Sequence, residues 1–119
     1  MSIAMKIKSF NTIIYCKKWD QTVSFYKNEL RLPITLSKEW FVEFQLTENA
    51  RISVANESKS SIKSCQGKGI TISLEVKDLE ALHALLEKDR LKPTMVKEIW
   101  ESKQFYIYDP EGNRIEFWS

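Results

Sequence analysis

The alternation of apolar and polar residues predicts strands and one helix in the first half of the chain. The segment 10–16, FNTIIYC, is rich in β-branched and aromatic residues, which favour a β-strand. Apolar residues that recur every three to four positions, at 19, 23, 26 and 30, predict a helix over 19–30 with one apolar stripe. Pro33 prevents this helix from continuing. The alternating segments 40–46 and 50–55, WFVEFQL and ARISVA, predict two strands joined by a turn.

The second half begins with the same order of elements. GITISLEV, 69–76, predicts a strand, and a helix is expected from about Asp78 to Lys88. Asp78 is placed to cap this helix, because its carboxylate can accept a hydrogen bond from an amide of the first turn. His83 lies off the expected apolar stripe, so we expect it on the surface. The stripe comprises Leu79, Leu82, Leu85 and Leu86.

Three further strands are expected at the end of the chain, near 92–99, 103–108 and 113–118. The last two are separated by the sequence DPEG, 109–112. Proline presets φ and glycine supplies a positive φ, so this sequence predicts a tight hairpin turn.

An internal repeat relates the two halves. Pro33 and Pro93, and likewise Trp40 and Trp100, are each separated by 60 positions. A slightly larger shift carries NARISV onto GNRIEF. The repeat predicts an α+β fold of two βαβββ modules in a single domain, 1–119. We place module one at about 6–56, a linker rich in Ser, Lys and Gly at about 57–68, and module two at about 69–119.

Composition narrows the functional class. The chain has 119 residues, with 43% apolar and 29% charged residues and a net charge of +2. These values fit an ordinary globular protein, and the scattered Lys and Arg residues give no basic patch for nucleic acid. No apolar run is long enough for a membrane span or a signal peptide, so we expect a cytoplasmic protein. Cys16 and Cys65 form no CxxC motif and are expected to be free thiols.

Strand alternation also sorts each sheet into two faces. One face is consistently apolar and is expected to pack against the helices. The other is polar and aromatic, and we expect it to meet a ligand. The residues predicted on this second face are Asn11, Ile13, Tyr15, Glu43, Gln45, Arg51, Ser53, Thr71, Ser73, Glu75, Tyr106, Tyr108, Arg114, Glu116 and Trp118.

The paired modules, SFYKNELRLP after the first strand and FYIYDPEGNRIEFW at the end together resemble the vicinal oxygen chelate superfamily. This superfamily includes glyoxalase I, the bleomycin-resistance proteins and the extradiol dioxygenases. The resemblance implies that the curved mixed sheets of the two modules form a cup with the helices outside. It leaves open whether the modules pair within one chain or between chains.

The resemblance also indicates where a metal would be held. Metal-dependent members place one ligand, usually His, Gln or Glu, on each of four strands. Transition-metal sites draw their affinity from imidazole, thiolate and carboxylate groups, and three of the four positions here offer only neutral oxygens. We therefore expect no metal and no cofactor, with a magnesium or calcium site formed by Glu116 and assisted by Glu43 or Glu75 as an alternative. The four positions are Asn11, Ser53, Thr71 and Glu116.

A face that combines aromatic rings with carboxylates suits a planar or cationic small molecule. The resemblance to bleomycin-resistance proteins, which bind their drug without a metal, implies a metal-free binding protein that sequesters an aromatic or cationic antibiotic. It also implies a homodimer. We expect no nucleic-acid or membrane partner. The expected ligand-binding residues are Asn11, Tyr15, Ser53, Thr71, Glu75, Tyr106, Tyr108, Glu116 and Trp118.

Other functions are compatible with the same residues. A lyase, isomerase or dioxygenase-like enzyme of the superfamily would use Glu116 as a base or a metal ligand. A structural interaction module is a third interpretation. Trp40 and Trp100 are expected either to close the rim of the cup or to pack on the hairpins of their own modules.

Overall fold

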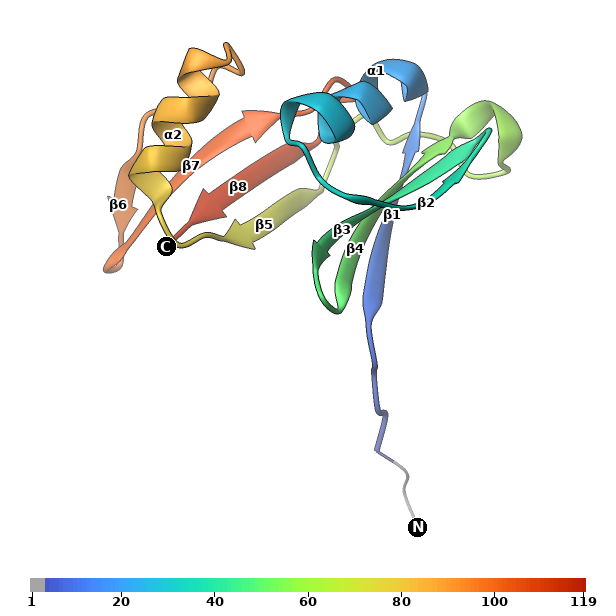
Figure 1. Ribbon diagram of the computed structural model, residues 1–119, viewed down its shortest axis with the longest axis horizontal. Coiled ribbons are helices and arrows are strands. Elements are labelled where there is room, and N and C mark those ends of the chain that lie inside the picture. The colour runs from blue at the N-terminus through green and yellow to red at the C-terminus, as the bar shows by residue number, and fades with distance from the viewer. Residues whose placement is uncertain (1–3) are drawn as a thin grey trace. The chain divides into compact units, whose positions relative to one another are not determined.

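The structure is a computed structural model that describes residues 4–119. The chain divides into two compact units, one up to Ser64 and the other Cys65–Ser119. Each unit contains a four-stranded mixed sheet and one main helix (Figure 1). The predicted α+β fold of two βαβββ modules is therefore confirmed, and each module is described by itself.

Module one has the sheet order β1-β4-β3-β2. β1 pairs with β4 in parallel, and the other two pairs are antiparallel. A long crossover joins the parallel strands β1 and β4, and it contains α1 and the β2–β3 hairpin. The elements are β1 (Phe10–Cys16), α1 (Trp19–Ser24), the π-helical turn η1 (Phe25–Glu29), β2 (Ile34–Lys38), β3 (Phe41–Thr47), β4 (Ala50–Asn56) and the 3₁₀ turn η2 (Glu57–Lys59).

Module two repeats this topology with the order β5-β8-β7-β6 and a parallel β5–β8 pair. Asp78 caps α2 as predicted, since its Oδ1 accepts a hydrogen bond from the Ala81 amide at 3.2 Å. The elements are β5 (Thr71–Glu75), α2 (Leu79–Lys88), β6 (Lys97–Ile99), β7 (Ser102–Tyr108) and β8 (Arg114–Trp118).

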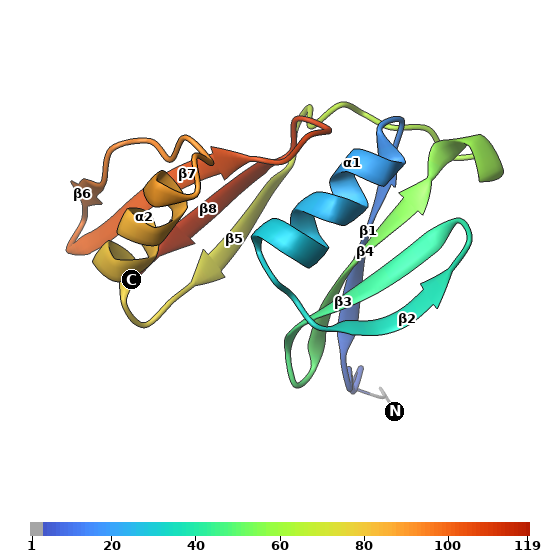
Figure 2. The ribbon, with the colours of Figure 1, turned by 45° about the horizontal axis from the view of Figure 1, so that its top comes forward.

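The first helix differs from the predicted pattern. Its second half widens into the π-helical turn η1, in which the Leu30 amide donates to the Phe25 carbonyl at 2.9 Å. Thr22 of α1 and Phe25 of η1 are buried, although the predicted stripe omitted both. Tyr26 is buried as predicted and packs at a tilt against Phe44 of β3, with 5.9 Å between ring centroids. Figure 2 shows α1 lying against the sheet of its own module.

The expected stripe of the second helix was partly wrong. Leu79 and Leu86 are buried, but Leu85 is 46% exposed. His83, and not Leu85, faces the sheet together with Leu79, because it follows Leu79 by one helical turn. Its ring packs edge-on against Phe105 of β7, with centroids 4.9 Å apart, and its Nε2 donates to the Thr94 carbonyl at 2.9 Å. His83 is therefore half-buried, although its hydrogen bond to the Thr94 carbonyl lies at the surface.

The strand predicted over 92–99 is restricted to β6, Lys97–Ile99. Pro93 has no amide hydrogen to donate to a ladder. Lys92 has a positive φ of 55°, which also interrupts an extended strand. Thr94 still joins β7 locally, because it donates its amide to the Tyr106 carbonyl at 2.9 Å and accepts the Tyr106 amide on its hydroxyl at 2.8 Å.

The turn at 109–112 forms as predicted between β7 and β8. The Gly112 amide donates to the Asp109 carbonyl at 3.0 Å, and Gly112 has a φ of +94°. The end of the predicted linker lies directly on this turn. A Cβ added to Gly67, which has a φ of +80°, would collide with the Gly112 carbonyl. Close backbone approach therefore fixes where the chain enters β5.

Within the part of the chain that the structure describes, no helix has the length and apolar character needed to cross a bilayer. Cys16 is buried and Cys65 is exposed, and the two cysteines do not form a disulfide bond with each other, as expected.

Candidate ligand-binding site

Each sheet has an apolar face under its helix and a polar face on the other side, and the strand register fixes which residues share a side. In module one, Asn11 pairs with Arg51, and Glu43 pairs with Ser53. The predicted assignment of these side chains to one face is therefore correct. We call this set the module-one polar face: Asn11, Ile13, Tyr15, Glu43, Gln45, Arg51 and Ser53.

The polar groups of the module-one polar face bond to one another. Ser53, which is fully buried, donates its hydroxyl to Asn11 Oδ1 at 2.8 Å. The Asn11 amide donates to Glu43 Oε2 at 3.5 Å, and Thr35 donates to Glu43 Oε1 at 2.7 Å. The Glu43 carboxylate also forms an ion pair with Arg51, whose Nε lies 3.3 Å from Oε1. The single acid of this face is thus neutralised by its neighbours.

The module-two polar face is organised in the same way. Tyr106 pairs with Glu116, Tyr108 with Arg114, and Glu75 with Trp118. All predicted members therefore share one side of this sheet, as expected. The module-two polar face comprises Thr71, Ser73, Glu75, Gln104, Tyr106, Tyr108, Arg114, Glu116 and Trp118.

Three interactions hold the Glu116 and Arg114 side chains of the module-two polar face. Ser73 donates its hydroxyl to Glu116 Oε1 at 2.6 Å, so the lone acid of the last strand is hydrogen-bonded across to β5. Arg114 donates its Nε–H to Thr71 Oγ1 at 3.0 Å, and its guanidinium carbon lies 4.5 Å above the Tyr106 ring. Both charges are thus held in fixed positions on the sheet.

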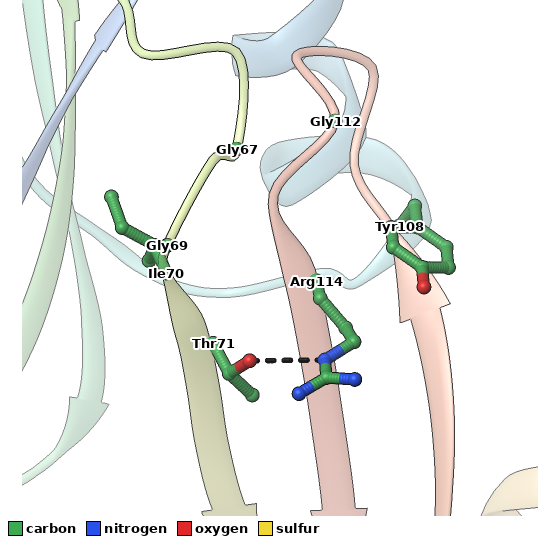
Figure 3. A pocket seen from close by; sticks show the side chains of 7 residues that line it. All are labelled: Gly67, Gly69, Ile70, Thr71, Tyr108, Gly112 and Arg114. Atoms are coloured by element: carbon green, nitrogen blue, oxygen red, sulfur yellow. Dashed lines mark hydrogen bonds between the residues drawn. The ribbon is translucent and has the colours of Figure 1, made fainter.

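An open pocket of about 470 Å³ lies at the end of the module-two polar face where β5 and β8 begin and β7 ends. Figure 3 shows the Arg114 side chain extending beneath the turn, with the Thr71 hydroxyl on one side and the Tyr108 ring on the other. The pocket is lined by Gly67, Gly69, Ile70, Thr71, Tyr108, Gly112 and Arg114.

The structure distributes the predicted ligand-binding residues over the two polar faces. Asn11, Tyr15 and Ser53 lie on the first, and Asn11 contacts Ser53 directly. Thr71 and Tyr108 also line the pocket. The remaining members, which lie on the module-two polar face, are Glu75, Tyr106, Glu116 and Trp118.

Arg114 is not among the predicted ligand-binding residues, although strand alternation places it on the polar face. The repeat contained the missing signal. Arg51 and Arg114 are separated by 63 positions, the same shift that relates Ser53 to Glu116. Glu43 corresponds to Tyr106 by this shift, so the acid beside the first arginine is replaced by a ring beside the second.

Trp40 and Trp100 lie in the turns that precede β3 and β7. Trp40 contacts the ring of Phe41, with 5.4 Å between centroids. Trp100 is 93% exposed and has a φ of 56°, so it does not pack on the hairpin of its own module.

The residues at the four positions implied for a metal do not fit a transition metal. Ser53 and Asn11 are hydrogen-bonded to each other, and the Thr71 hydroxyl accepts from Arg114. A cation beside Thr71 would also lie beside the positive charge of the Arg114 guanidinium. Among the described residues, no group of three or more His, Cys, Asp or Glu side chains is arranged to hold a metal.

Comparisons with known proteins identify the family. The glyoxalase-like domain family matches residues 10–119, and the chain belongs to this family. The match supports the resemblance to the vicinal oxygen chelate superfamily. A comparison with curated proteins found no match.

Solved structures show the same fold at low sequence identity. A lactoylglutathione lyase from Agrobacterium tumefaciens is 17% identical, with a TM-score of 0.75 over 91% of this chain and 90% of that protein. A glyoxalase/bleomycin resistance protein/dioxygenase from Nocardioides is 12% identical, with a TM-score of 0.79 over 98% and 85%. The oxidase ChaP-H1 is 14% identical, with a TM-score of 0.72 over 98% and 96%. Proteins named as a lyase and as an oxidase thus share this fold.

Proposed function

We propose that this chain is a small-molecule binding protein of the glyoxalase-like family that holds an aromatic ligand without a transition metal and without converting it. The observation that best supports the absence of a transition-metal site is the hydrogen bonding at Asn11, Ser53 and Thr71. Their neutral oxygens are bonded within the sheets, and none has the basicity of a histidine or carboxylate ligand.

The only histidine in the chain supports the same conclusion. His83 is on α2, and its Nε2 is bonded to the Thr94 carbonyl beside Phe105, on the helix-covered side of the sheet. It is therefore not a member of either polar face. Both cysteines are also outside the two polar faces, since Cys16 is buried in the core and Cys65 precedes β5.

The composition of the two faces favours recognition of a planar molecule. Tyr15, Tyr106 and Trp118 are half-buried, so part of each ring is accessible for stacking. Glu116, the candidate base, has one oxygen bonded to the Ser73 hydroxyl at 2.6 Å. A carboxylate held in this way suits hydrogen bonding to a ligand.

A ligand screen on metal-stripped protein tests this proposal. We would add aromatic small molecules, including aromatic antibiotics, to protein treated with a chelator and measure the shift in unfolding temperature. A ligand at about 100 times its Kd should stabilise the fold by roughly 2.7 kcal/mol. The bound compound should be recovered unchanged by mass spectrometry.

Glu116→Gln is the variant that separates binding from catalysis. A binding protein should keep measurable affinity, because an amide can still accept a hydrogen bond from Ser73. Conversion of the compound by the wild-type chain, lost in Glu116→Gln, would establish an acid–base enzyme instead. A screen in which no compound raises the unfolding temperature would favour a structural module. The homodimer is part of this proposal, and sedimentation analysis measures it directly.

A further inference from the structure

We propose that Arg114 is the centre of an oxyanion-binding subsite in the module-two pocket, and that the ligand carries a carboxylate or phosphate group which this arginine receives. The inference rests on the proposed function, because it names the chemical group by which the same polar face recognises its ligand. It differs from the expectation of a cationic ligand, which was based on the aromatic rings and the carboxylates.

The guanidinium is held in place before any ligand binds. Its Nε–H is bonded to Thr71 Oγ1 at 3.0 Å, and its plane is supported by the Tyr106 ring at 4.5 Å. The ring is itself fixed, because Gln104 donates to the Tyr106 hydroxyl at 2.8 Å. A side chain ordered in this way loses little conformational entropy when a ligand binds.

The terminal nitrogens of Arg114 are available to a ligand. A guanidinium has five N–H donors, and one of them is bonded to Thr71. Within residues 4–119 the other four have no protein acceptor and lie at the open pocket of Figure 3. Two parallel N–H groups match the two oxygens of a carboxylate or phosphate.

The charge of Arg114 is not balanced by an ion pair. Among the described residues, no carboxylate lies within ion-pair distance of it. Glu116, two positions along the same strand, is bonded to Ser73 at 2.6 Å. Arg51, at the corresponding position of module one, is instead paired with Glu43 at 3.3 Å. Of these two equivalent arginines, only Arg114 therefore has its positive charge available for an anion.

The rest of the pocket completes the subsite. The Thr71 hydroxyl accepts from Arg114, so its own hydrogen is free to point toward a ligand oxygen. Gly67, Gly69 and Gly112 add no side chains, which keeps the pocket open. Its volume of about 470 Å³ accommodates a single-ring aromatic acid.

The experiment is a titration of isotope-labelled full-length protein with benzoate, phenylphosphate and neutral benzamide, followed by NMR. Benzoate or phenylphosphate should shift the Arg114 Nε–H and the amides of Gly67, Gly69 and Gly112 at millimolar concentrations. Whichever of the two acids binds more tightly identifies the oxyanion. Benzamide should bind at least about tenfold more weakly, as expected when a charged hydrogen bond is lost.

Arg114→Gln should lower the benzoate and phenylphosphate affinities by about tenfold or more. Arg51→Gln is the matched control and should leave both unchanged. Equal losses in the two variants, equal binding of benzamide, or no shift with either acid would each overturn the subsite. If the acids fail while a neutral aromatic binds, the proposed function stands without this subsite. If no compound of any charge binds, the proposed function fails as well.

Discussion

Arg51 and Arg114 occupy the same position in the two modules, yet their charges have different partners. Each lies opposite a short polar residue on the neighbouring parallel strand, Asn11 for Arg51 and Thr71 for Arg114. Arg51 is paired with the Glu43 carboxylate, whereas Arg114 lies over a tyrosine ring. The duplicated sheets have thus retained the arginine while exchanging its partner, and this exchange creates the proposed difference in function between the faces.

Converting module two to the arrangement of module one should abolish oxyanion binding. Tyr106→Glu places a carboxylate beside Arg114, as Glu43 lies beside Arg51. Glu116→Ser places a serine opposite this new carboxylate, as Ser53 lies opposite Glu43. The new ion pair should neutralise the guanidinium. We expect the benzoate affinity measured by NMR titration to fall by about tenfold or more.

Glu116→Ser alone is the control for this double variant. It removes a nearby negative charge without adding a partner for Arg114, so benzoate affinity should stay equal or rise. Full benzoate affinity in a folded double variant would show that the charge of Arg114 does not bind the anion.

Gly67→Ala should destabilise the protein more than Gly69→Ala. Both glycines have a positive φ, +80° and +78°, which costs an alanine about 1 kcal/mol. Only at Gly67 would the added Cβ also collide with the Gly112 carbonyl. Urea unfolding should show a further loss of about 1–3 kcal/mol at Gly67. Equal losses for the two variants would mean that the linker does not pack on this turn.

Asp109→Ala should destabilise the last hairpin. The Asp109 carboxylate is buried and accepts hydrogen bonds from the Glu111 amide and from both the backbone and side-chain nitrogens of Asn113, each at 2.9 Å. Removing it leaves these donors unsatisfied, at a cost of about 2–4 kcal/mol in the free energy of unfolding. The measurement is urea unfolding at neutral pH. A loss below about 0.5 kcal/mol, typical of a surface substitution, would contradict this role.

Glu80→Gln should reduce stability slightly at neutral pH and not in acid. Lys103 of β7 donates to Glu80 Oε1 at 3.0 Å, and this hydrogen bond lowers the pKa of Glu80 below its ordinary value of 4.5. A pKa lowered by folding stabilises the native state above the ordinary value, and this contribution disappears as the pH falls through the lowered pKa. The effect is small because the pair is exposed to solvent.

Unfolding of the wild type and Glu80→Gln at neutral pH and at a pH below the lowered value measures this difference. Glu87→Gln, at an exposed position on the same helix, is the control and should show no pH-dependent difference from the wild type. A Glu80→Gln difference that grows in acid would contradict the expected sign.

Much of the fold could be predicted because strand alternation and turn chemistry are local signals. β1 follows FNTIIYC residue for residue, and Asp109 to Gly112 form the expected turn. The repeat then fixed the topology of both modules. The two polar faces followed from the same alternation, because no bulge shifts β7 against β8.

The predictions that failed depend on backbone geometry and on contacts between distant parts of the chain. A π-helical turn has no clear sequence signal, so 25–29 was predicted as regular helix. The stripe was defined by apolar residues, so the polar Thr22 was left out although it follows Trp19 by one helical turn. The contacts of the His83 ring with Phe105 and with the Thr94 carbonyl were also missed, because both partners lie on other elements of the chain. The repeat shows that Tyr106 replaces Glu43 as the neighbour of the arginine. That this replacement leaves Arg114 without an ion pair depends on distances that only the structure gives.

Metal content is the most direct test of the central claim that the neutral residues at positions 11, 53 and 71 leave this chain unable to hold a transition metal. Untagged protein, purified without chelators and incubated with nickel, zinc, iron or manganese before desalting, should contain far less than one ion per chain by elemental mass spectrometry. One tightly bound ion per chain, lost in Glu116→Gln, would contradict the account.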